Sequence, residues 1–467
     1  MPSDKAGIIP RLRPRSVFPT LPVTPLNPRP LSTAIRPSAC PGLLRIVPAL
    51  DGGICRIKLA GGVISAAQAV AVAEAAQEFA GGVIEATNRA NLQIRGIGGE
   101  HQALIAKLLE AGLGPATAAG DDVRNLMLSP SAGIDRQCLV DTRPLAAQIL
   151  HTLQGHPRFH ELSPKFAVQL DGGEDLAMLQ HHHDLWLAAC EREGQRLLAF
   201  GLAGCLADAP LAAVPLEQGH DLLVAVLEAF LDLASPEQTR MRHLLAQVPV
   251  AEFLLQVRQR LGGPLLSVDG WRRPAVAEGL HLGTYPQAVA GRVYVGAVAP
   301  LGRLDPGMLK GAAQLAQRYG DSSLRLTPWQ SLLLPEIAVA DAPAVTAGLA
   351  ELGLLCRPEQ ALAHLIACTG SSGCAKAQAD TKGDALRLAA LLQAQGQQAA
   401  VHLSGCLRTC AAAHVAPTTL LAVAPGRYDL YVRDATQPGF GRLRARNLSI
   451  EAAQALLDVR QRSHLDD

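Results

Sequence analysis

The chain has 467 residues, with 42 Lys and Arg against 41 Asp and Glu, and it is 49% hydrophobic but only 3% aromatic. This length predicts a multidomain protein. The balanced charge argues against binding nucleic acid or an anionic membrane through a global field, so any anion site must be local. Glu228 and Asp232 interrupt the apolar run at residues 222–233, which predicts no membrane span. The N-terminus has no signal-peptide pattern, so we expect a cytoplasmic protein.

Residues 1–38 hold nine prolines, five arginines and one acidic residue, Asp4, without helical or strand periodicity. This composition predicts a flexible tail. A transit peptide is the alternative, because such peptides are also Arg-rich and acid-poor, but the prolines oppose the amphipathic helix that they use.

The rest of the chain contains an internal repeat, in which strand, helix and strand patterns recur in the same order. A chance likeness between Ala-, Leu- and Gly-rich segments is the alternative, and the matched spacing argues against it. The matched pairs are residues 52–94 and 291–334, 124–133 and 363–373, and 165–173 and 398–406.

The repeat predicts an α+β, tandem-duplicated protein in which short strand–helix–strand modules alternate with larger α/β modules about a pseudo-twofold axis. Charged and apolar segments between the halves predict a helical connector. The expected segments are the tail 1–38, the short module 39–117, the α/β module 118–235, the connector 236–277, the short module 278–357 and the α/β module 358–467.

Four of the ten cysteines form a C-x5-C and a C-x3-C pair within residues 368–410. Thiolates select iron–sulfur clusters or zinc, and structural zinc sites favour shorter spacings in both pairs. The Gly/Ser turn around the first pair is expected to open a helix, whose free N–H groups suit an anionic cluster. We therefore expect a [4Fe–4S] cluster rather than zinc or four free core cysteines. Its ligands would be Cys368, Cys374, Cys406 and Cys410.

The remaining cysteines are interpreted as core residues, because a lone cysteine is a common small core side chain. They are Cys40, Cys55, Cys138, Cys190, Cys205 and Cys356.

The first half carries Ser129 and Gly173 where the second has cysteines, and it supplies cations instead. Arg and Lys at strand ends and turns can converge on carboxylates. Each one alone is more often a solvated surface charge. Together, at positions equivalent by repeat to the cluster loops, they predict a polyanion site shared between the halves. These residues are Arg89, Arg95, Arg124 and Lys165.

From about Cys40 to Leu457 the chain resembles the sirohaem-dependent sulfite and nitrite reductases, in TNRANLQIRG, LAGGVIS, the two cysteine pairs and APGRYDL. The resemblance implies two ferredoxin-like half-domains and two larger α/β domains. It also implies a cluster on the four cysteines, with Cys410 bridging to the sirohaem iron. Tetrapyrrole carboxylates would then meet Arg89, Arg124 and Lys165.

Two departures bear on the activity. The reductases have a K-x-K pair where this chain has Lys165 and then Ala167, and Pro-Asn-containing sequence where it has Leu407, Arg408 and Thr409. The segments CTGSSGCAKAQADTKGDA and HLSGCLRTCAAAH more closely resemble the precorrin-3B synthase branch of the family.

That branch implies an O2-dependent monooxygenase of aerobic cobalamin biosynthesis, which hydroxylates precorrin-3A at a meso carbon with lactone formation. The tetrapyrrole would be the substrate, and electrons would originate from NADH. The chain has no G-x-G-x-x-G between a strand and a helix, so we expect an external NADH-linked electron donor. A sirohaem-dependent sulfite or nitrite reductase and a non-enzymatic tetrapyrrole carrier remain as alternatives.

A mononuclear non-haem iron is also expected in that branch, and a facial triad would need two histidines and a carboxylate. Surface histidines are the alternative for the H-H-H-D run, so no ligand is assigned to the iron. The candidates are His181, His182, His183, Asp184, His364, His402 and His414.

Overall fold

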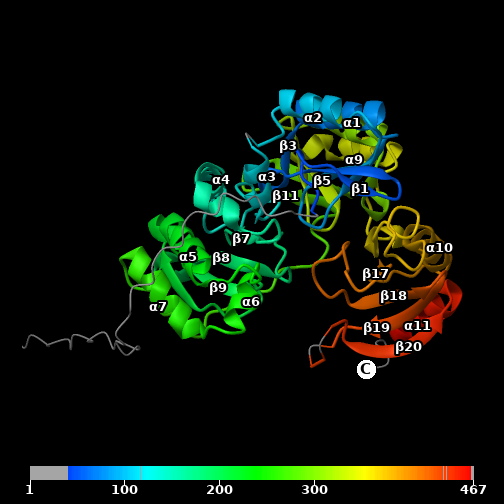
Figure 1. The fold of residues 1–467 in the computed structure, drawn as a ribbon. Coiled ribbons are helices and arrows are strands. Elements are labelled where there is room, and N and C mark those ends of the chain that lie inside the picture. The colour runs from blue at the N-terminus through cyan, green and yellow to red at the C-terminus, as the bar shows by residue number, and fades with distance from the viewer. Residues whose placement is uncertain (1–39, 116, 435, 438, 464–467) are drawn as a thin grey trace, which may run out of the picture. The chain divides into compact units, whose positions relative to one another are not determined.

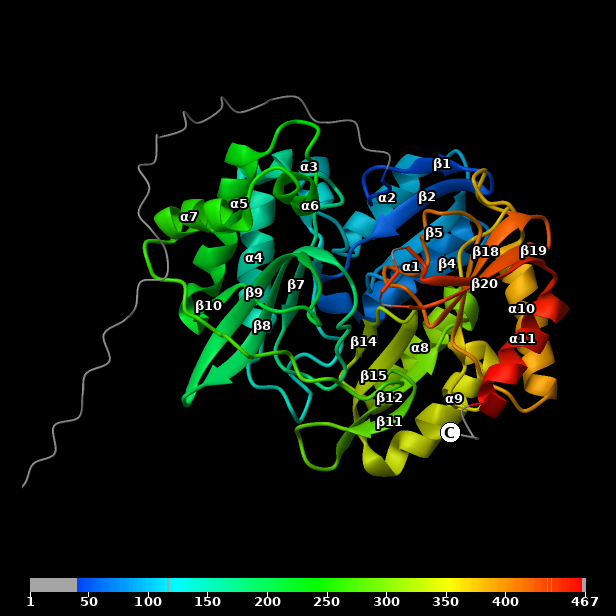
Figure 2. The same ribbon diagram turned by 90° about the horizontal axis from the view of Figure 1, so that it is seen from below.

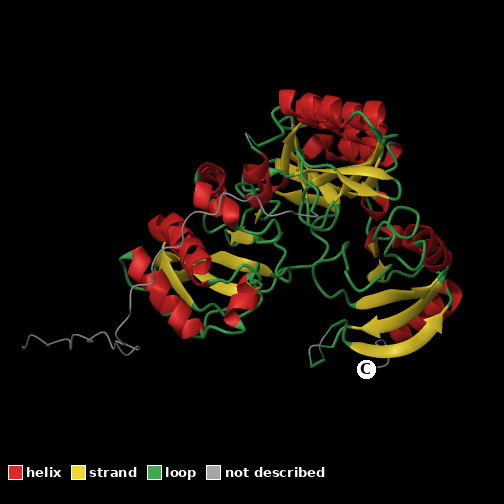
Figure 3. Cartoon of the chain, viewed as in Figure 1, coloured by secondary structure: helices red, strands yellow, loops and turns green. Residues whose placement is uncertain are grey.

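The computed structural model describes residues 40–115, 117–434, 436–437 and 439–463, which all belong to one compact unit. The predicted tail, residues 1–38, lies outside the described residues. Four five-stranded sheets with helices packed on them make up the described part (Figure 3). None of the described helices is long and apolar enough to cross a membrane.

The first sheet is antiparallel, and buried and less buried residues alternate along its second strand, as expected for a sheet with one face on a core. Ser65 is the N-cap of the helix α1 (Ala66–Phe79), because its hydroxyl accepts a hydrogen bond from Gln68 N and Gln68 Oε1 accepts one from Ser65 N. The strands in order are β1 (Val47–Ala49), β2 (Gly52–Ile57), β5 (Leu92–Ile97), β4 (Val83–Ala86) and β13 (Arg303–Leu304), with helices α1 and α2 (His101–Glu110).

The second short module repeats this pattern. Asp305 begins its first helix by accepting a hydrogen bond from Met308 N at 2.8 Å. The strands in order are β11 (Gly283–Pro286), β12 (Arg292–Val298), β15 (Ser331–Ala338), β14 (Ser323–Leu326) and β3 (Val63–Ser65), with helices α8 (Pro306–Tyr319) and α9 (Ala342–Glu351).

The two short modules exchange strands. β3 comes from the first half but pairs with β14, and β13 comes from the second half but pairs with β4. Helices α1 and α8 pack on each other, and one hydrophobic core contains buried residues of both helices and of both sheets, in the region where Figure 1 shows α1, α2 and α9. The two modules are therefore interlocked, which the sequence pattern of two separate strand–helix–strand units does not reveal.

The first α/β module has three parallel strands followed by two antiparallel ones. Strand β8 reads as a nearly continuous buried run, as expected for a strand covered on both faces. The strands are β6 (Leu126–Met127), β7 (Val168–Asp171), β8 (His183–Arg192), β9 (Gln195–Gly204) and β10 (Ala212–Pro215), with helices α3 (Ala118–Val123), α4 (Arg143–Gly155) and α5 (Gly219–Leu233).

The segment predicted as a helical connector, 236–277, contains α6 (Met241–Leu245) and α7 (Val250–Leu261). Helix α7 packs against α5, and its Phe253 and Val257 are fully buried in the core of the first α/β module. These helices therefore complete that module as well as linking the halves.

The last module has the same order of three parallel and two antiparallel strands. Helices α10 and α11 lie side by side on one face of its sheet (Figure 2). The strands are β16 (Leu365–Ala367), β17 (Val401–Ser404), β18 (Thr418–Ala424), β19 (Arg427–Val432) and β20 (Arg442–Leu448), and the helices are α10 (Thr381–Ala394) and α11 (Ile450–Ser463).

The predicted α+β class and tandem duplication are confirmed. Short 3-10 helices occur at matching places before β3 and β13. They are η1 (Ala60–Gly62) and η4 (Pro300–Gly302), and the others are η2 (Pro157–Glu161), η3 (Leu216–Gln218), η5 (Val339–Asp341) and η6 (Ala361–His364).

Candidate active site

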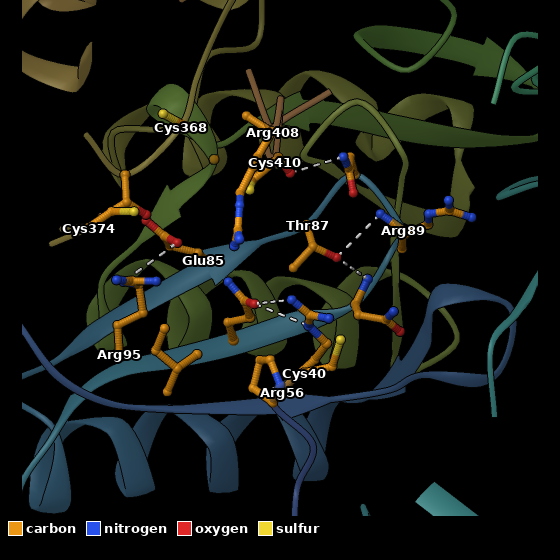
Figure 4. Close-up of a pocket in the computed structure, with 18 of the residues that line it drawn as sticks. Cys40, Arg56, Glu85, Thr87, Arg89, Arg95, Cys368, Cys374, Arg408 and Cys410 are labelled. Atoms are coloured by element: carbon orange, nitrogen blue, oxygen red, sulfur yellow. Dashed lines mark hydrogen bonds and ion pairs between the residues drawn. The ribbon is translucent and has the colours of Figure 1, made fainter. Parts of the chain in front are cut away.

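A cavity of about 860 Å³ lies where the first half-domain, the first α/β module and the cysteine loops meet. Figure 4 shows Cys368, Cys374 and Cys410 on one side and Arg56 and Arg95 of the first sheet on the other. This volume lies in the range of pockets that hold a cofactor. All eight residues predicted for the site line it, namely Arg89, Arg95, Arg124, Lys165, Cys368, Cys374, Cys406 and Cys410.

The cysteine wall is built by the loops that follow β16 and β17. Because parallel strands end at the same edge of a sheet, these loops lie together. Cys368 follows β16 directly, and its Sγ accepts a hydrogen bond from Gly405 N at 3.2 Å. The predicted helix start at the first pair is wrong, because α10 begins only at Thr381, after an Asp380 cap. A loop amide, not the helix end, reaches this sulfur.

The four thiols lie near one another. Burial raises the pKa of Cys410, and the neighbouring Cys406, Cys368 and Cys374 raise it further. Among the described residues, no group of three or more His, Cys, Asp or Glu could hold one metal ion. In a cubane each thiolate binds a different iron, so its ligands stand farther apart than those of one zinc ion. The four thiols on this cavity supply the number and type of ligands that a [4Fe–4S] cluster needs.

The first half-domain braces both cysteine loops. Arg95 donates to both carboxylate oxygens of Asp51 at 3.0 and 2.9 Å and to the carbonyl of Gly373 at 3.2 Å. Asn88 Nδ2 donates to the carbonyl of Cys410 at 3.2 Å. Because the charge of Arg95 is neutralised by Asp51, this residue supports the cysteine wall rather than offering a free cation to a ligand.

The cationic wall contains guanidinium groups with unused donors. Arg124 donates from NH2 to Asp121 at 2.9 Å, while its buried Nε has no hydrogen-bond partner in the described part of the chain. A buried donor without a partner is costly, so an acceptor is expected there. Lys165 is exposed on the cavity wall, and no described carboxylate lies within ion-pair distance of it. The lining fits an anionic cofactor that carries carboxylates.

Arg56 is a cavity residue that the sequence analysis missed. Its Nε and NH2 donate to Gln93 Oε1 at 3.1 and 2.7 Å, and burial lowers its pKa. Cys55 and Ile57 point into the core, so strand alternation places Arg56 on the opposite face. That alternation is a signal that could have found Arg56 once β2 was assigned.

Four more cations line the cavity, and the sequence analysis assigned none of them to the site; they are Arg240, Lys376, Lys382 and Arg408. Lys382 is buried and donates to the carbonyl of Leu301 at 2.6 Å. Arg240 pairs with the buried carboxylate of Asp184. Arg408 reaches from the loop between the last two cysteines into the cavity (Figure 4).

The histidines considered as iron ligands do not assemble a single-ion site. Both carboxylate oxygens of Asp184 accept from Arg240 Nε at 2.9 Å, so this carboxylate is already neutralised. His181 Nε2 lies 3.0 Å from His414 Nδ1. In the described part of the chain no third His, Cys, Asp or Glu joins such a pair in metal-binding geometry. The structure therefore does not support the expected mononuclear iron.

Comparisons with known proteins bear on this cavity. The family model described as nitrite/sulfite reductase ferredoxin-like half domain matches residues 48–112 and 285–352. The model described as nitrite and sulphite reductase 4Fe-4S domain matches residues 119–265. A chloroplastic ferredoxin–nitrite reductase of Zea mays is 32% identical over 390 residues, which cover 77% of this chain and 68% of the relative. This chain belongs to the nitrite and sulfite reductase family.

Other relatives carry similar names. A ferredoxin–nitrite reductase of Synechococcus elongatus is 29% identical, over 79% of this chain and 76% of its own. A ferredoxin-dependent sulfite reductase of Mycolicibacterium paratuberculosis is 29% identical, over 77% and 68%. The solved structure of the Mycobacterium tuberculosis NirA protein superposes with a TM-score of 0.72 at 24% identity, over 87% of this chain and 79% of that one. The predicted reductase-like fold is thereby confirmed.

These findings overturn the predicted activity. Relatives at about 30% identity over most of the chain are named nitrite and sulfite reductases, so the prediction of a precorrin-3B synthase is wrong. The expected precorrin-3A, O2 and NADH-linked donor are contradicted with it, because the relatives are named for ferredoxin. Assignment to an oxidoreductase holds, but assignment to a monooxygenase does not.

The comparisons support part of the predicted cofactor set, although they contradict the predicted activity. The 4Fe-4S family model and the nitrite reductase relatives support a [4Fe–4S] cluster, and sirohaem is typical of the family. That model matches the first repeat, whereas the four cysteines lie at 368–410, beyond its match.

Proposed function

We propose that this protein is a sirohaem-dependent reductase of nitrite, with sulfite as a second substrate of the same chemistry. The observation that supports this proposal is one cavity that carries four cysteines on one wall and several unneutralised cations on the other. Cys368, Cys374, Cys406 and Cys410 would hold the [4Fe–4S] cluster. When bound, the cluster would deliver electrons singly, and the sirohaem iron would bind the substrate anion.

The arginines would hold the tetrapyrrole by its carboxylates. Arg124 offers a buried Nε that has no partner among the described residues, and Arg89 offers a guanidinium whose partners there are neutral. An arginine fork matches carboxylate geometry, and a low-dielectric wall strengthens each contact. Arg95 would act indirectly, by bracing the loop that carries Cys374.

Small anions need positive charge on the open side of the cavity. Ala167 replaces the second lysine of the reductases' K-x-K pair, but other residues of the cavity still carry positive charge. Lys165, Arg56 and Arg408 also line the cavity, and none has a carboxylate within ion-pair distance among the described residues. These groups would attract nitrite or sulfite, and Lys165 can also donate a proton to an oxygen that leaves as water.

We infer that the electron donor is a ferredoxin-type iron–sulfur protein, because the relatives are named for such a donor. It would approach the exposed side of the cysteine loops, where Lys376 and Arg408 are exposed. The cytoplasmic location stays a prediction from the sequence.

The test is an anaerobic purification in which iron, acid-labile sulfide and sirohaem are counted per chain. Reduced methyl viologen then supplies electrons for the reduction of nitrite or sulfite, and the reaction is measured as the loss of the anion. We expect a cluster, a sirohaem absorption band and turnover of at least one anion. Purified protein that takes up sirohaem and cluster but reduces neither anion would contradict the proposal.

Cys410→Ser tests the cluster ligands, with Cys190→Ser as the control because Cys190 is buried in the first α/β module, away from the cavity. We expect the first variant to lose most of its iron and sulfide and the second to keep both. Equal iron and sulfide in Cys410→Ser and the unaltered protein would refute this ligand assignment.

A further inference from the structure

Arg89 is held by a neutral side chain, unlike most other cations of the cavity. Its NH1 lies 2.8 Å from His183 Nε2, and its NH2 donates to the carbonyl of His182 at 3.5 Å. Arg95, Arg124 and Arg240, by contrast, each donate to a carboxylate. Arg89 therefore keeps its positive charge available while its direction is fixed.

The hydrogen bonds determine the protonation state of His183. An arginine can only donate, so Nε2 must accept, and the carbonyl of His181, 2.9 Å from Nδ1, can only accept, so Nδ1 carries the hydrogen. A second proton would set two N–H groups against each other. Burial and the charge of Arg89 lower the pKa of His183 well below its usual value, in agreement with a neutral ring.

The next residue, Asp184, neutralises the arginine that it holds, which is Arg240. Asp184 is buried, and it neutralises Arg240 through two contacts of 2.9 Å. Burial, followed by repulsion from Arg240, lowers the pKa of Arg89 to about 10, so its guanidinium stays charged at neutral pH. Two consecutive residues at the start of β8 thus orient two arginines on one cavity wall, and they leave only Arg89 with an uncompensated charge.

We propose that His183 is a positioning residue that aims Arg89 at a carboxylate of the bound tetrapyrrole without neutralising it. The inference deepens the proposed function and rests on it for the identity of the ligand. Among the described residues that line the cavity, Arg89 is included and His183 is not, so we expect His183 to affect cofactor affinity rather than the reduction itself.

Three substitutions separate orientation from charge. His183→Gln keeps an acceptor for Arg89, His183→Leu removes it, and His183→Glu keeps it but adds a neutralising charge. The matched control is His182→Leu, because the side chain of His182 is exposed and only its backbone meets Arg89.

Sirohaem is titrated into the sirohaem-depleted full-length protein and followed by absorbance. Loss of one oriented charged contact is expected to raise Kd about tenfold in the Leu and Glu variants, and the Gln and control variants should stay within about twofold. Thermal unfolding should be similar in all four. Unchanged affinity in both His183→Leu and His183→Glu would overturn the proposal.

A second measurement needs no tetrapyrrole. The rate at which phenylglyoxal modifies Arg89, read by peptide mass spectrometry, should rise in His183→Leu and not in His183→Gln. An unchanged rate would overturn the positioning role. If the rate rises but the unaltered protein binds no sirohaem, the positioning role stands and the proposed function fails.

Discussion

Lys382 places a buried cation beside the cysteine wall. Its Nζ donates to the carbonyls of Leu301 and Ala367, at 2.6 and 3.4 Å, and lies 3.6 Å from the Glu85 carboxylate. Ala367 immediately precedes Cys368, so the ammonium group is close to one proposed ligand. A nearby positive charge favours the reduced, more negative cluster.

We therefore predict that Lys382→Met lowers the reduction potential of the cluster by tens of millivolts, on the order expected for loss of one partly screened charge. An anaerobic redox titration followed by electron paramagnetic resonance measures the shift. Lys310→Met is the control, because Lys310 of α8 pairs with Glu74 of α1 and the described lining of the cavity includes neither residue. A potential equal to that of the control would refute the prediction.

Glu174 is fully buried in the first α/β module, next to an ion pair between Asp171 and Arg273 with N and O 2.6 Å apart. Burial, and then the charge of Asp171, raises the pKa of Glu174 to about 8 from 4.5. The folded protein therefore holds a proton that the unfolded chain releases at lower pH. Stability from this proton is present at low pH and is lost as the pH rises through about 8.

Glu174→Gln should remove that dependence. We predict that urea unfolding of the unaltered protein shows a free energy lower at about pH 9 than at about pH 6, and that the variant reduces this difference by roughly 1–3 kcal/mol. Parallel pH profiles for both proteins would show that Glu174 is ionised in the folded state.

Distinctive side chains were predictable from the sequence, whereas their partners were not. The four cysteines and four cations stand out by chemistry and repeat spacing, and all eight line the cavity. That Arg95 is neutralised by Asp51, and that Arg56 joins the wall, depends on strand register and turns that the pattern alone does not specify.

At the scale of elements, the exchanged strands depend on a close approach at one glycine. Gly62 has a φ of +74°, and a Cβ there would lie 2.4 Å from the carbonyl oxygen of Leu326, next to the β3–β14 pair. Gly81 has a φ of +62° with open space around it. The two sites share the backbone strain of a substitution but differ in the steric conflict.

We predict that Gly62→Ala destabilises the protein by at least roughly 1–2 kcal/mol more than Gly81→Ala, because only the first forces β3 away from β14. Urea unfolding of both variants measures the difference. Equal free energies of unfolding would mean that the approach of β3 is not tight.

Short elements explain what the sequence could not reveal about the sheets. β3 has three residues and β13 only two, which is too little for alternation to identify a strand or its partner. The longer α1 and α8 were predicted as the helices of the two strand–helix–strand patterns. Strand exchange was therefore invisible although the helices around it were predictable.

At the scale of the whole molecule, the interlocked modules make the two halves dependent on each other. Without residues 1–277, the second half lacks β3, whose fully buried Ile64 lies opposite Leu324. An exposed apolar edge of this kind favours aggregation over folding.

We predict that residues 278–467 expressed alone do not unfold cooperatively, and that co-expression with residues 1–277 restores a protease-resistant pair. Circular dichroism with urea, together with limited proteolysis, measures both states. A second half that unfolds cooperatively by itself would show that β3 is dispensable.

The prediction of a precorrin-3B synthase was wrong, and the reason lies in how the whole chain folds around the cavity. The prediction rested on two short segments and on departures from the reductases' motifs, among them Ala167 in place of the second lysine, and such local differences do not show the charge of the whole cavity. Arg56 and Arg408 come from two other segments, so only the folded chain shows how much charge converges there.

Pairing of β13 with β4 also sets an order of events during synthesis. Arg303 follows Glu85, its partner across the two strands, by 218 positions. A ribosome must therefore translate the whole first α/β module before the opening sheet gains its last strand. Until then the nascent chain carries an unpaired edge at β4, which can aggregate unless a chaperone covers it.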